Sequence, residues 1–131
     1  MNTINKMNFL IIDGAKDRIN FFSFYNNNSY HKSFTVSKDN NEKFSILLFN
    51  FLNNNNINLS KLNNILVNQG PGKFSVIRTS IAVAKALSLT NQLNLYGFNA
   101  EDLINDDYNS IINLYKKGKL TKNLINPVYS S

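Results

Sequence analysis

The sequence predicts an α/β protein built on one mixed sheet, and three observations predict it. Short apolar runs typical of strands fill the first third of the chain, two later segments carry apolar residues at helical spacing, and each of those helices leads into another short strand. Strands joined by short polar links form an antiparallel meander, whereas strands joined through a helix pair in parallel by right-handed crossovers. The expected order is three strands, helix, strand, helix, strand.

The meander comes first along the chain. Residues 9–12 are continuously apolar and end in Asp13-Gly14, residues 19–25 are rich in aromatic side chains, and residues 30–36 alternate in part. The asparagines at 26–28 form the turn between the second and third strands.

Two helices and two further strands follow. Asp39 or Asn40 caps a helix that runs to about residue 53, and a second helix extends from Phe74 or Ser75 to Leu89. Residues 65–68 form the strand between the helices, with a Gly70-Pro71-Gly72 turn after it. Residues 94–98 are predicted to be the last strand, and residues 100–104 a helical turn.

The C-terminal part differs in character, so we divide the chain into a lobe at 1–104 and a helix and tail at 105–131 that pack on the same domain. Residues 108–117 are predicted to form a short amphipathic helix, with Gly118 at its C-cap. Residues 124–129 are expected to be an edge strand or a docked tail.

Composition limits the function classes. The chain has 131 residues, 43% of them apolar, which fits one domain with a core of its own. No apolar run is long enough to span a bilayer, the first six residues do not resemble a signal peptide, and there is no cysteine for a disulfide or thiolate chemistry. A cytoplasmic protein is the simplest expectation.

The net charge of +6 suits contact with RNA or with an acidic partner. Only one lysine cluster stands out, and it is the candidate RNA contact. The alternative is a general basic character, because the other lysines are scattered and a bias toward AT-rich codons enriches Lys, Asn and Ile without any function. The clustered residues are Lys116, Lys117, Lys119 and Lys122.

The Gly70-Pro71-Gly72 turn and Lys73 are weak candidates for binding a phosphate. A helix N-terminus with converging N–H groups favours an anion, but the glycines lack the Walker spacing and the proline removes one donor. Asp13 could bind a metal or orient a nucleotide-bound water, yet it is equally suited to a turn. We favour a structural corner at both places.

No catalytic or metal site is predicted. His31 is the single histidine and has no ligand at a metal-binding spacing, and no carboxylate pair suggests acid–base catalysis. We therefore expect no cofactor, no metal and no catalytic residue.

The second helix carries the strongest functional signal. It is rich in small residues and is apolar on more than one face, which indicates cover on two sides, and the second cover is predicted to be another subunit. The predicted partner interface takes residues from both helices: Phe74, Ile77, Arg78, Ile81, Ala82, Lys85, Phe44, Leu48 and Phe51.

This stretch resembles the TsaB (YeaZ) family. The similarity to that family's Gly-Pro-Gly-Ser-Phe-Thr-Gly-Leu-Arg segment is carried by Gly70, Pro71, Gly72, Phe74, Arg78, Ala82, Lys85 and Leu87. The strands at 9–13 and 94–98 and the tail at 126–129 are similar as well. The resemblance implies a ribonuclease H-like sheet of the actin/Hsp70-like ATPase superfamily.

The resemblance also implies a function. Such a protein is a non-catalytic subunit that binds a TsaD-type threonylcarbamoyltransferase during the synthesis of threonylcarbamoyladenosine in tRNA. A TsaE-type ATPase is a further expected partner, tRNA is reached through the complex, and a homodimer is expected when no partner is present.

Departures from the family pattern shape these expectations. Lys73 replaces the usual Ser, Ser75-Val76 replaces Thr-Gly, and Gly14 and Ala15 follow Asp13 in place of Ser or Thr. A second lobe does not fit after residue 104, so we expect a single lobe without a nucleotide cleft of its own. Two alternatives to a TsaB-like subunit stay open: a small basic RNA-binding module, and a phosphate-handling enzyme built on Asp13 and the Gly70–Lys73 loop.

Overall fold

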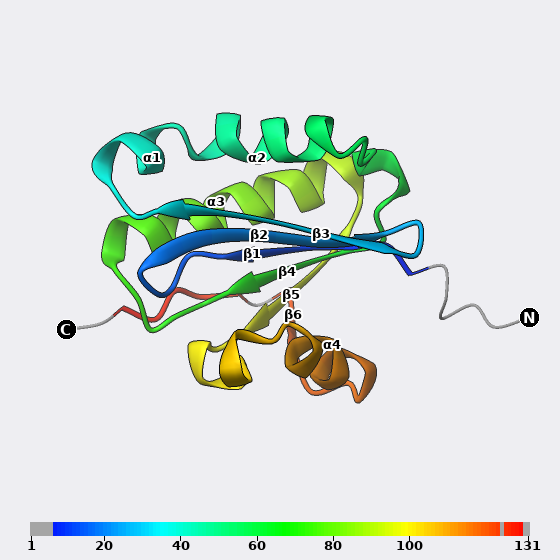
Figure 1. Cartoon of the computed structure of the whole chain (residues 1–131). Helices are drawn as coiled ribbons and strands as arrows, with labels where there is room; N and C mark the ends of the chain where they lie inside the picture. Colours follow the sequence, from blue (N-terminus) through cyan, green and yellow to red (C-terminus); the bar gives the residue numbers. More distant parts are fainter. Residues whose placement is uncertain (1–6, 124, 130–131) are drawn as a thin grey trace, which may run out of the picture.

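The computed structural model describes residues 7–123 and 125–129, which form three layers (Figure 1). A six-stranded mixed sheet lies in the middle. Helices α1 (Lys38–Glu42), α2 (Phe44–Asn54) and α3 (Phe74–Asn91) cover one face, and α4 (Asn109–Lys116) lies against the other.

The sheet has the strand order β3-β2-β1-β4-β5-β6. The first three strands form an antiparallel meander, β1, β4 and β5 pair in parallel, and β6 returns antiparallel to β5. The strands are β1 (Phe9–Asp13), β2 (Arg18–Tyr25), β3 (Asn28–Thr35), β4 (Asn64–Asn68), β5 (Asn94–Phe98) and β6 (Thr121–Lys122).

Asparagines make the tightest turn of the meander. Tyr25 pairs with Asn28, so the loop between β2 and β3 consists of Asn26 and Asn27, whose φ angles are 50° and 67°. A two-residue hairpin with both φ values positive matches the twist of the strands, and Asn tolerates this conformation better than most residues.

The main core lies between the sheet and α2 and α3. Along β2, Ile19, Phe21, Ser23 and Tyr25 alternate toward this side and are buried. The Phe21 ring contacts the rings of Phe44 and Phe51 from α2, with centroids 5.4 Å and 5.9 Å apart. These contacts fix α2 over the meander.

A smaller core lies on the opposite face. Phe9, Ile11, Leu66 and Phe98 project there and meet Tyr108 and Ile111 from the segment around α4. The cover is partial: Phe22 and Phe24 of β2 are only half-buried.

The predicted element order is confirmed, with three differences in detail. The first predicted helix is split at Lys43 into α1 and α2, and Ser37 caps α1, because its hydroxyl accepts a hydrogen bond from the Asn40 N–H. The added strand β6 was not predicted, since Thr121 and Lys122 carry no apolar pattern. Two 3-10 turns, Ala100–Asp102 and Ile104–Asp106, stand where one helical turn was expected.

From the sequence we expected the apolar faces of α3 to be covered by the sheet on one side and by another subunit on the other. For the faces of α3 that are buried, the expectation of another subunit is wrong. The sheet covers one side of α3, and α2 of the same chain packs on the main core beside it. Five residues predicted to bind a partner are at most 4% exposed and belong to this core: Ile77, Ile81, Phe44, Leu48 and Phe51.

None of the helices in the described part of the chain combines the length and apolar character that a membrane crossing demands.

Candidate functional site

Backbone atoms from other parts of the chain pack directly against the glycines of the Gly70-Pro71-Gly72 turn. The Gly70–Pro71 peptide bond is cis, and Gly70 has a φ of 109°. A Cβ atom at Gly70 would lie 2.1 Å from the carbonyl oxygen of Val128, and one at Gly72 would lie 2.7 Å from the carbonyl oxygen of Ala15. The glycines therefore make room for two neighbouring segments, which is the geometry of a structural corner.

The C-terminal tail closes this corner. The Val128 N–H donates to the Gln69 carbonyl at 2.8 Å, and the Gln69 side chain donates to the Asn126 carbonyl at 3.0 Å. Tyr129 forms an isolated parallel bridge with Gly72. The tail thus lies along the loop between β4 and α3, which agrees with the docked tail, one of the two alternatives expected at 124–129. Leu124 itself lies outside the described residues.

Asp13 lies at the buried end of β1, 2% exposed, and both of its carboxylate oxygens accept hydrogen bonds from the chain. The Asn68 amide donates to one oxygen at 2.9 Å, and the Tyr108 hydroxyl donates to the other at 2.7 Å. Asn68 in turn accepts a hydrogen bond from the Gly70 N–H at 2.9 Å. These bonds tie the ends of β1 and β4 to the corner.

Tyr108 is held as a neutral donor in this network. Burial raises the pKa of its hydroxyl far above the usual range, and the nearby Asp13 carboxylate and the hydrogen bond to it raise this pKa further. A neutral phenol donates to a carboxylate, so each oxygen of Asp13 has a hydrogen-bond donor within the chain.

The outer face of α3 is the part of the predicted interface that remains on the surface. Phe74 is 56% exposed, and Arg78, Ala82 and Lys85 are exposed as well. The Arg78 guanidinium lies 5.0 Å from the centroid of the Phe74 ring, and the Tyr129 ring lies 4.6 Å from it. The tail therefore adds an aromatic side chain to this face of the helix.

This face is slightly hollowed. A shallow depression is lined by Asn41 of α1 together with Phe74, Ser75, Arg78, Thr79 and Ala82 of α3. Further exposed apolar side chains lie on the same layer of the molecule, Leu89 on α3 and Ile46 and Phe49 on α2.

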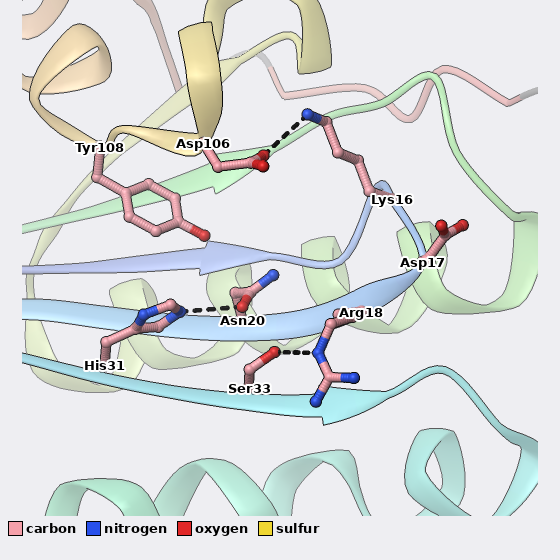
Figure 2. Close-up of a pocket in the computed structure, with 8 residues that line it drawn as sticks. All are labelled: Lys16, Asp17, Arg18, Asn20, His31, Ser33, Asp106 and Tyr108. Carbon is pink, nitrogen blue, oxygen red and sulfur yellow. Dashed lines mark hydrogen bonds and ion pairs between the residues drawn. The ribbon is translucent and has the colours of Figure 1, made fainter.

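A second depression lies over the partly covered face of β2 and β3 (Figure 2). Its polar groups are largely paired with one another. The Lys16 ammonium contacts the Asp106 carboxylate at 3.0 Å, Arg18 donates to Ser33, and His31 bonds Asn20 at 2.9 Å. Because the charges and donors are internally matched, the depression resembles a solvated surface more than a ligand site.

His31 packs on aromatic rings. Its ring meets Tyr108 at 5.8 Å and Phe22 at 6.4 Å, both edge to face. Within the ranges that the structure describes, no three His, Cys, Asp or Glu side chains come together as a metal site would require.

The clustered lysines lie at the end of α4 and on β6. Lys116, Lys117, Lys119 and Lys122 are all exposed, and the Lys122 ammonium lies 5.7 Å from the Tyr96 ring. Helix α4 lies on the opposite side of the sheet from α3, and β6 is the edge strand of the sheet (Figure 1).

Comparison with known proteins relates this arrangement to a family. A family model described as TsaD, tRNA N6-adenosine threonylcarbamoyltransferase, matches residues 23–104. The tRNA threonylcarbamoyladenosine biosynthesis protein TsaB of Buchnera aphidicola is 30% identical over 95 residues, which cover 72% of this chain and 45% of that protein. The chain belongs to the TsaB (YeaZ) family.

Solved structures agree on the fold of this TsaB-family chain. YeaZ from Pseudomonas aeruginosa superimposes with a TM-score of 0.69 at 14% identity, over 86% of this chain and 50% of that one. A second structure, of a protein with similarity to peptidase YeaZ from P. aeruginosa, gives the same TM-score and identity over 85% and 49%. The chain thus spans about half the length of the relatives it matches, and it has the ribonuclease H-like single lobe that the resemblance implied.

Two contacts of the TsaB-family site were missed by sequence reasoning. Tyr108 completes the Asp13 network, and Tyr129 packs on Phe74. The similarity of residues 126–129 to the closing tail of the family was a signal for the second contact. Nothing in the local sequence signals the first.

Proposed function

We propose that this chain is a non-catalytic TsaB-type subunit that binds a TsaD-type threonylcarbamoyltransferase and supports the synthesis of threonylcarbamoyladenosine in tRNA. The observation that carries the proposal is the exposed outer face of α3, where Phe74, Arg78, Ala82 and Lys85 remain accessible. The residues of α3 that are buried lie on the side that packs on the sheet and α2: Val76, Ile77, Ser80, Ile81, Ala84 and Leu87. The family membership and the family model matched at residues 23–104 indicate the partner class.

The non-catalytic part of the proposal is supported by the contacts that Asp13 and the two glycines of the turn make within the chain. Both oxygens of Asp13 accept hydrogen bonds from the chain, and the backbone of Val128 and of Ala15 fills the space beside the two glycines. Asp13, Gly70 and Gly72 are candidate groups of the alternative phosphate-handling enzyme, and their contacts within the chain favour the non-catalytic role. The fourth candidate, Lys73, is exposed.

Co-purification tests the interface. Ala82→Arg places a long charged side chain at the middle of the exposed face of α3, and Ala82 is exposed there, so the fold is expected to tolerate it. We expect retention on a tagged TsaD-type protein from the same genome to fall about tenfold or more, which corresponds to about 1.4 kcal/mol.

Asn113→Arg is the matched control, because Asn113 is an exposed residue of α4 on the other side of the sheet. It should bind like the unmodified chain. Equal retention of Ala82→Arg and the control would contradict the proposed interface. Formation of threonylcarbamoyladenosine by the chain without a TsaD-type protein would contradict the non-catalytic role.

A further inference from the structure

The sheet ends in β3 on one side and in β6 on the other. Strand β6 has 2 residues, whereas β3 has 8 and pairs with β2 in an unbroken register from Asn28 to Thr35. Proteins keep an edge strand from pairing with other strands by making it short or by interrupting it with a proline or a bulge. Strand β3 is not short and contains neither a proline nor a bulge, so its outer edge is able to accept another strand.

Backbone groups along this outer edge have no partner within the described residues. Because Tyr25 and Asn28 close a two-residue turn, they form a hydrogen-bonded pair, and such pairs alternate with non-bonded pairs along an antiparallel ladder. At the far end of β3 the Thr35 carbonyl accepts a hydrogen bond from the Asn40 amide. The residues between, whose N–H and C=O groups point away from β2 and stay unpaired in the described structure, are Ser29, His31 and Ser33.

A depression lies beside this edge, between β3 and α2. Its lining includes the apolar side chains of Phe34, Leu47 and Phe51 and the amides of Asn50 and Asn54. Both asparagines are exposed, and neither side chain forms a hydrogen bond with the described residues. Alternate side chains of an added strand would point into this depression, where they meet an apolar surface with free amide groups beside it.

The charge on this surface is positive. Lys32 lies in the middle of β3, which has no other charged residue, and α2 has none. The Lys32 ammonium lies 5.9 Å from the centroid of the Phe34 ring and takes part in no ion pair of the described residues. Because opposite charges on facing positions of two strands stabilise their pairing, a strand with a carboxylate opposite Lys32 suits this edge.

A second copy of β3 is a poorer occupant of the edge. An antiparallel pair of β3 strands centred on Lys32 would place the two ammonium groups opposite each other, which is unfavourable. In every other register the second β3 still brings no carboxylate to Lys32, because the strand contains none.

We infer that the outer edge of β3 binds an extended acidic segment of another protein, with a carboxylate opposite Lys32. The segment extends the sheet by one strand, pairs with the backbone groups of Ser29, His31 and Ser33, and directs alternate side chains into the depression beside α2. This surface is separate from the exposed face of α3, so the inference does not depend on the proposed function.

The first experiment uses the full chain and a synthetic peptide, acetyl-Val-Thr-Glu-Thr-Val-Thr-amide. Paired antiparallel to residues 29–34, this peptide places its glutamate opposite Lys32. We expect NMR titration of the isotope-labelled chain to shift the amide signals of β3, and hydrogen exchange at the His31 amide to slow. The same peptide with Lys in place of Glu should bind about tenfold more weakly at low salt. Equal binding of the two peptides, or no change at the amides of β3, would overturn the inference.

Methylation of the peptide nitrogens tests the backbone pairing. Methyl groups on the three threonine nitrogens remove the N–H groups that would bond to β3, whereas methyl groups on the valine and glutamate nitrogens replace N–H groups that point away from it. The first methylated peptide should lose binding and the second should retain most of it. If the two bind alike, the segment does not add to the sheet and the inference fails.

Variants of the chain provide the reciprocal test. Lys32→Glu should reverse the preference, so that the lysine peptide binds more tightly than the glutamate peptide. Lys122→Glu makes the same change in charge on β6, at the other edge of the sheet, and should keep the preference for glutamate. An unchanged preference in Lys32→Glu would contradict the inference. Self-association of the unmodified chain that slows exchange at the His31 amide would also overturn it, because a second copy would then occupy the edge.

Discussion

The Tyr108 hydroxyl donates a 2.7 Å hydrogen bond to the Asp13 carboxylate, across 95 residues of sequence. This contact joins the end of the central strand β1 to the segment that leads into α4. The Tyr108 ring also stacks on Phe22 with a centroid separation of 5.0 Å. The Tyr108 side chain therefore packs in the smaller core and also donates a hydrogen bond to Asp13, in the polar network next to the Gly70-Pro71-Gly72 turn.

Removing this hydroxyl should destabilise the fold. In Tyr108→Phe the ring contacts remain, but the buried Asp13 carboxylate loses one of its two side-chain donors. A hydrogen bond to a charged group contributes about 1.5–3 kcal/mol to stability. We expect the free energy of unfolding in urea to fall by this amount, with an unchanged m-value.

Tyr30→Phe is the control for this measurement, because the described structure shows no side-chain hydrogen bond for the half-buried Tyr30. It should change the free energy of unfolding by less than about 0.5 kcal/mol. Equal stabilities for the two variants would show that the Asp13 network does not stabilise the fold.

The same hydroxyl should make the chain sensitive to alkali. The pKa of Tyr108 is raised in the folded state, chiefly by burial, so the folded protein retains this proton when the unfolded chain releases it. Its contribution to stability is fully present below the ordinary tyrosine pKa of about 10 and decreases as the pH rises above that value. The measurement is urea denaturation at pH 8.5 and pH 10.5, and the stability of the unmodified chain should fall more steeply than that of Tyr108→Phe. Parallel falls would contradict this.

The sequence predicted the elements well where a pattern is local. The apolar run at 9–12 and the helical spacing after Phe74 each indicate their own element, and the structure has both with bounds changed by one or two residues. The partner of Asp13 could not be predicted in this way, because Tyr108 is brought to it only by the packing of α4 on the sheet. Strand β6 could not be predicted either, because its two polar residues form a strand only by pairing with β5 and have no apolar pattern of their own.

The interface prediction shows a related limit. Ile77 and Ile81 are apolar residues of a helix that is packed against other elements on two sides. Their apolar character shows that they must be buried, but it does not show whether the same chain or a partner buries them. In the folded chain the cover is the sheet and α2, which bury Leu48 and Phe51 in the same core. The remaining candidates, Phe74, Arg78, Ala82 and Lys85, are the ones that this packing leaves exposed, and their contact with a partner stays a prediction.

The lysine cluster predicts a salt-dependent contact with tRNA. All four of its side chains are exposed at the end of α4 and on β6. Changing Lys116, Lys117, Lys119 and Lys122 to Gln should weaken tRNA binding and reduce the slope of log K against log salt by up to about three, because each lost phosphate contact removes about 0.7–0.9 from the slope. Fluorescence anisotropy with labelled tRNA at 25–200 mM salt measures both quantities.

Four exposed lysines outside the cluster provide the control with the same change in charge: Lys32, Lys38, Lys43 and Lys61. Their glutamine variant should bind tRNA more tightly than the cluster variant. If both variants lose affinity equally, the basic character is general and the cluster has no specific role.

Two glycines with positive φ should respond differently to alanine. Gly70 has a φ of 109°, and a Cβ there would lie 2.1 Å from the Val128 carbonyl oxygen, whereas Gly118 has a φ of 69° and open space around it. Gly118→Ala should therefore cost only the conformational penalty, about 1 kcal/mol. Gly70→Ala adds a collision with backbone and should cost more than about 2 kcal/mol in urea denaturation, or else displace the tail. Hydrogen exchange at the Val128 amide, which donates to the Gln69 carbonyl, distinguishes these results. Faster exchange of the Val128 amide in Gly70→Ala, with little loss of stability, would mean that the tail detaches and that Tyr129 no longer packs on Phe74. An equal, small loss of stability in Gly70→Ala and Gly118→Ala would contradict the close packing of the tail on the turn.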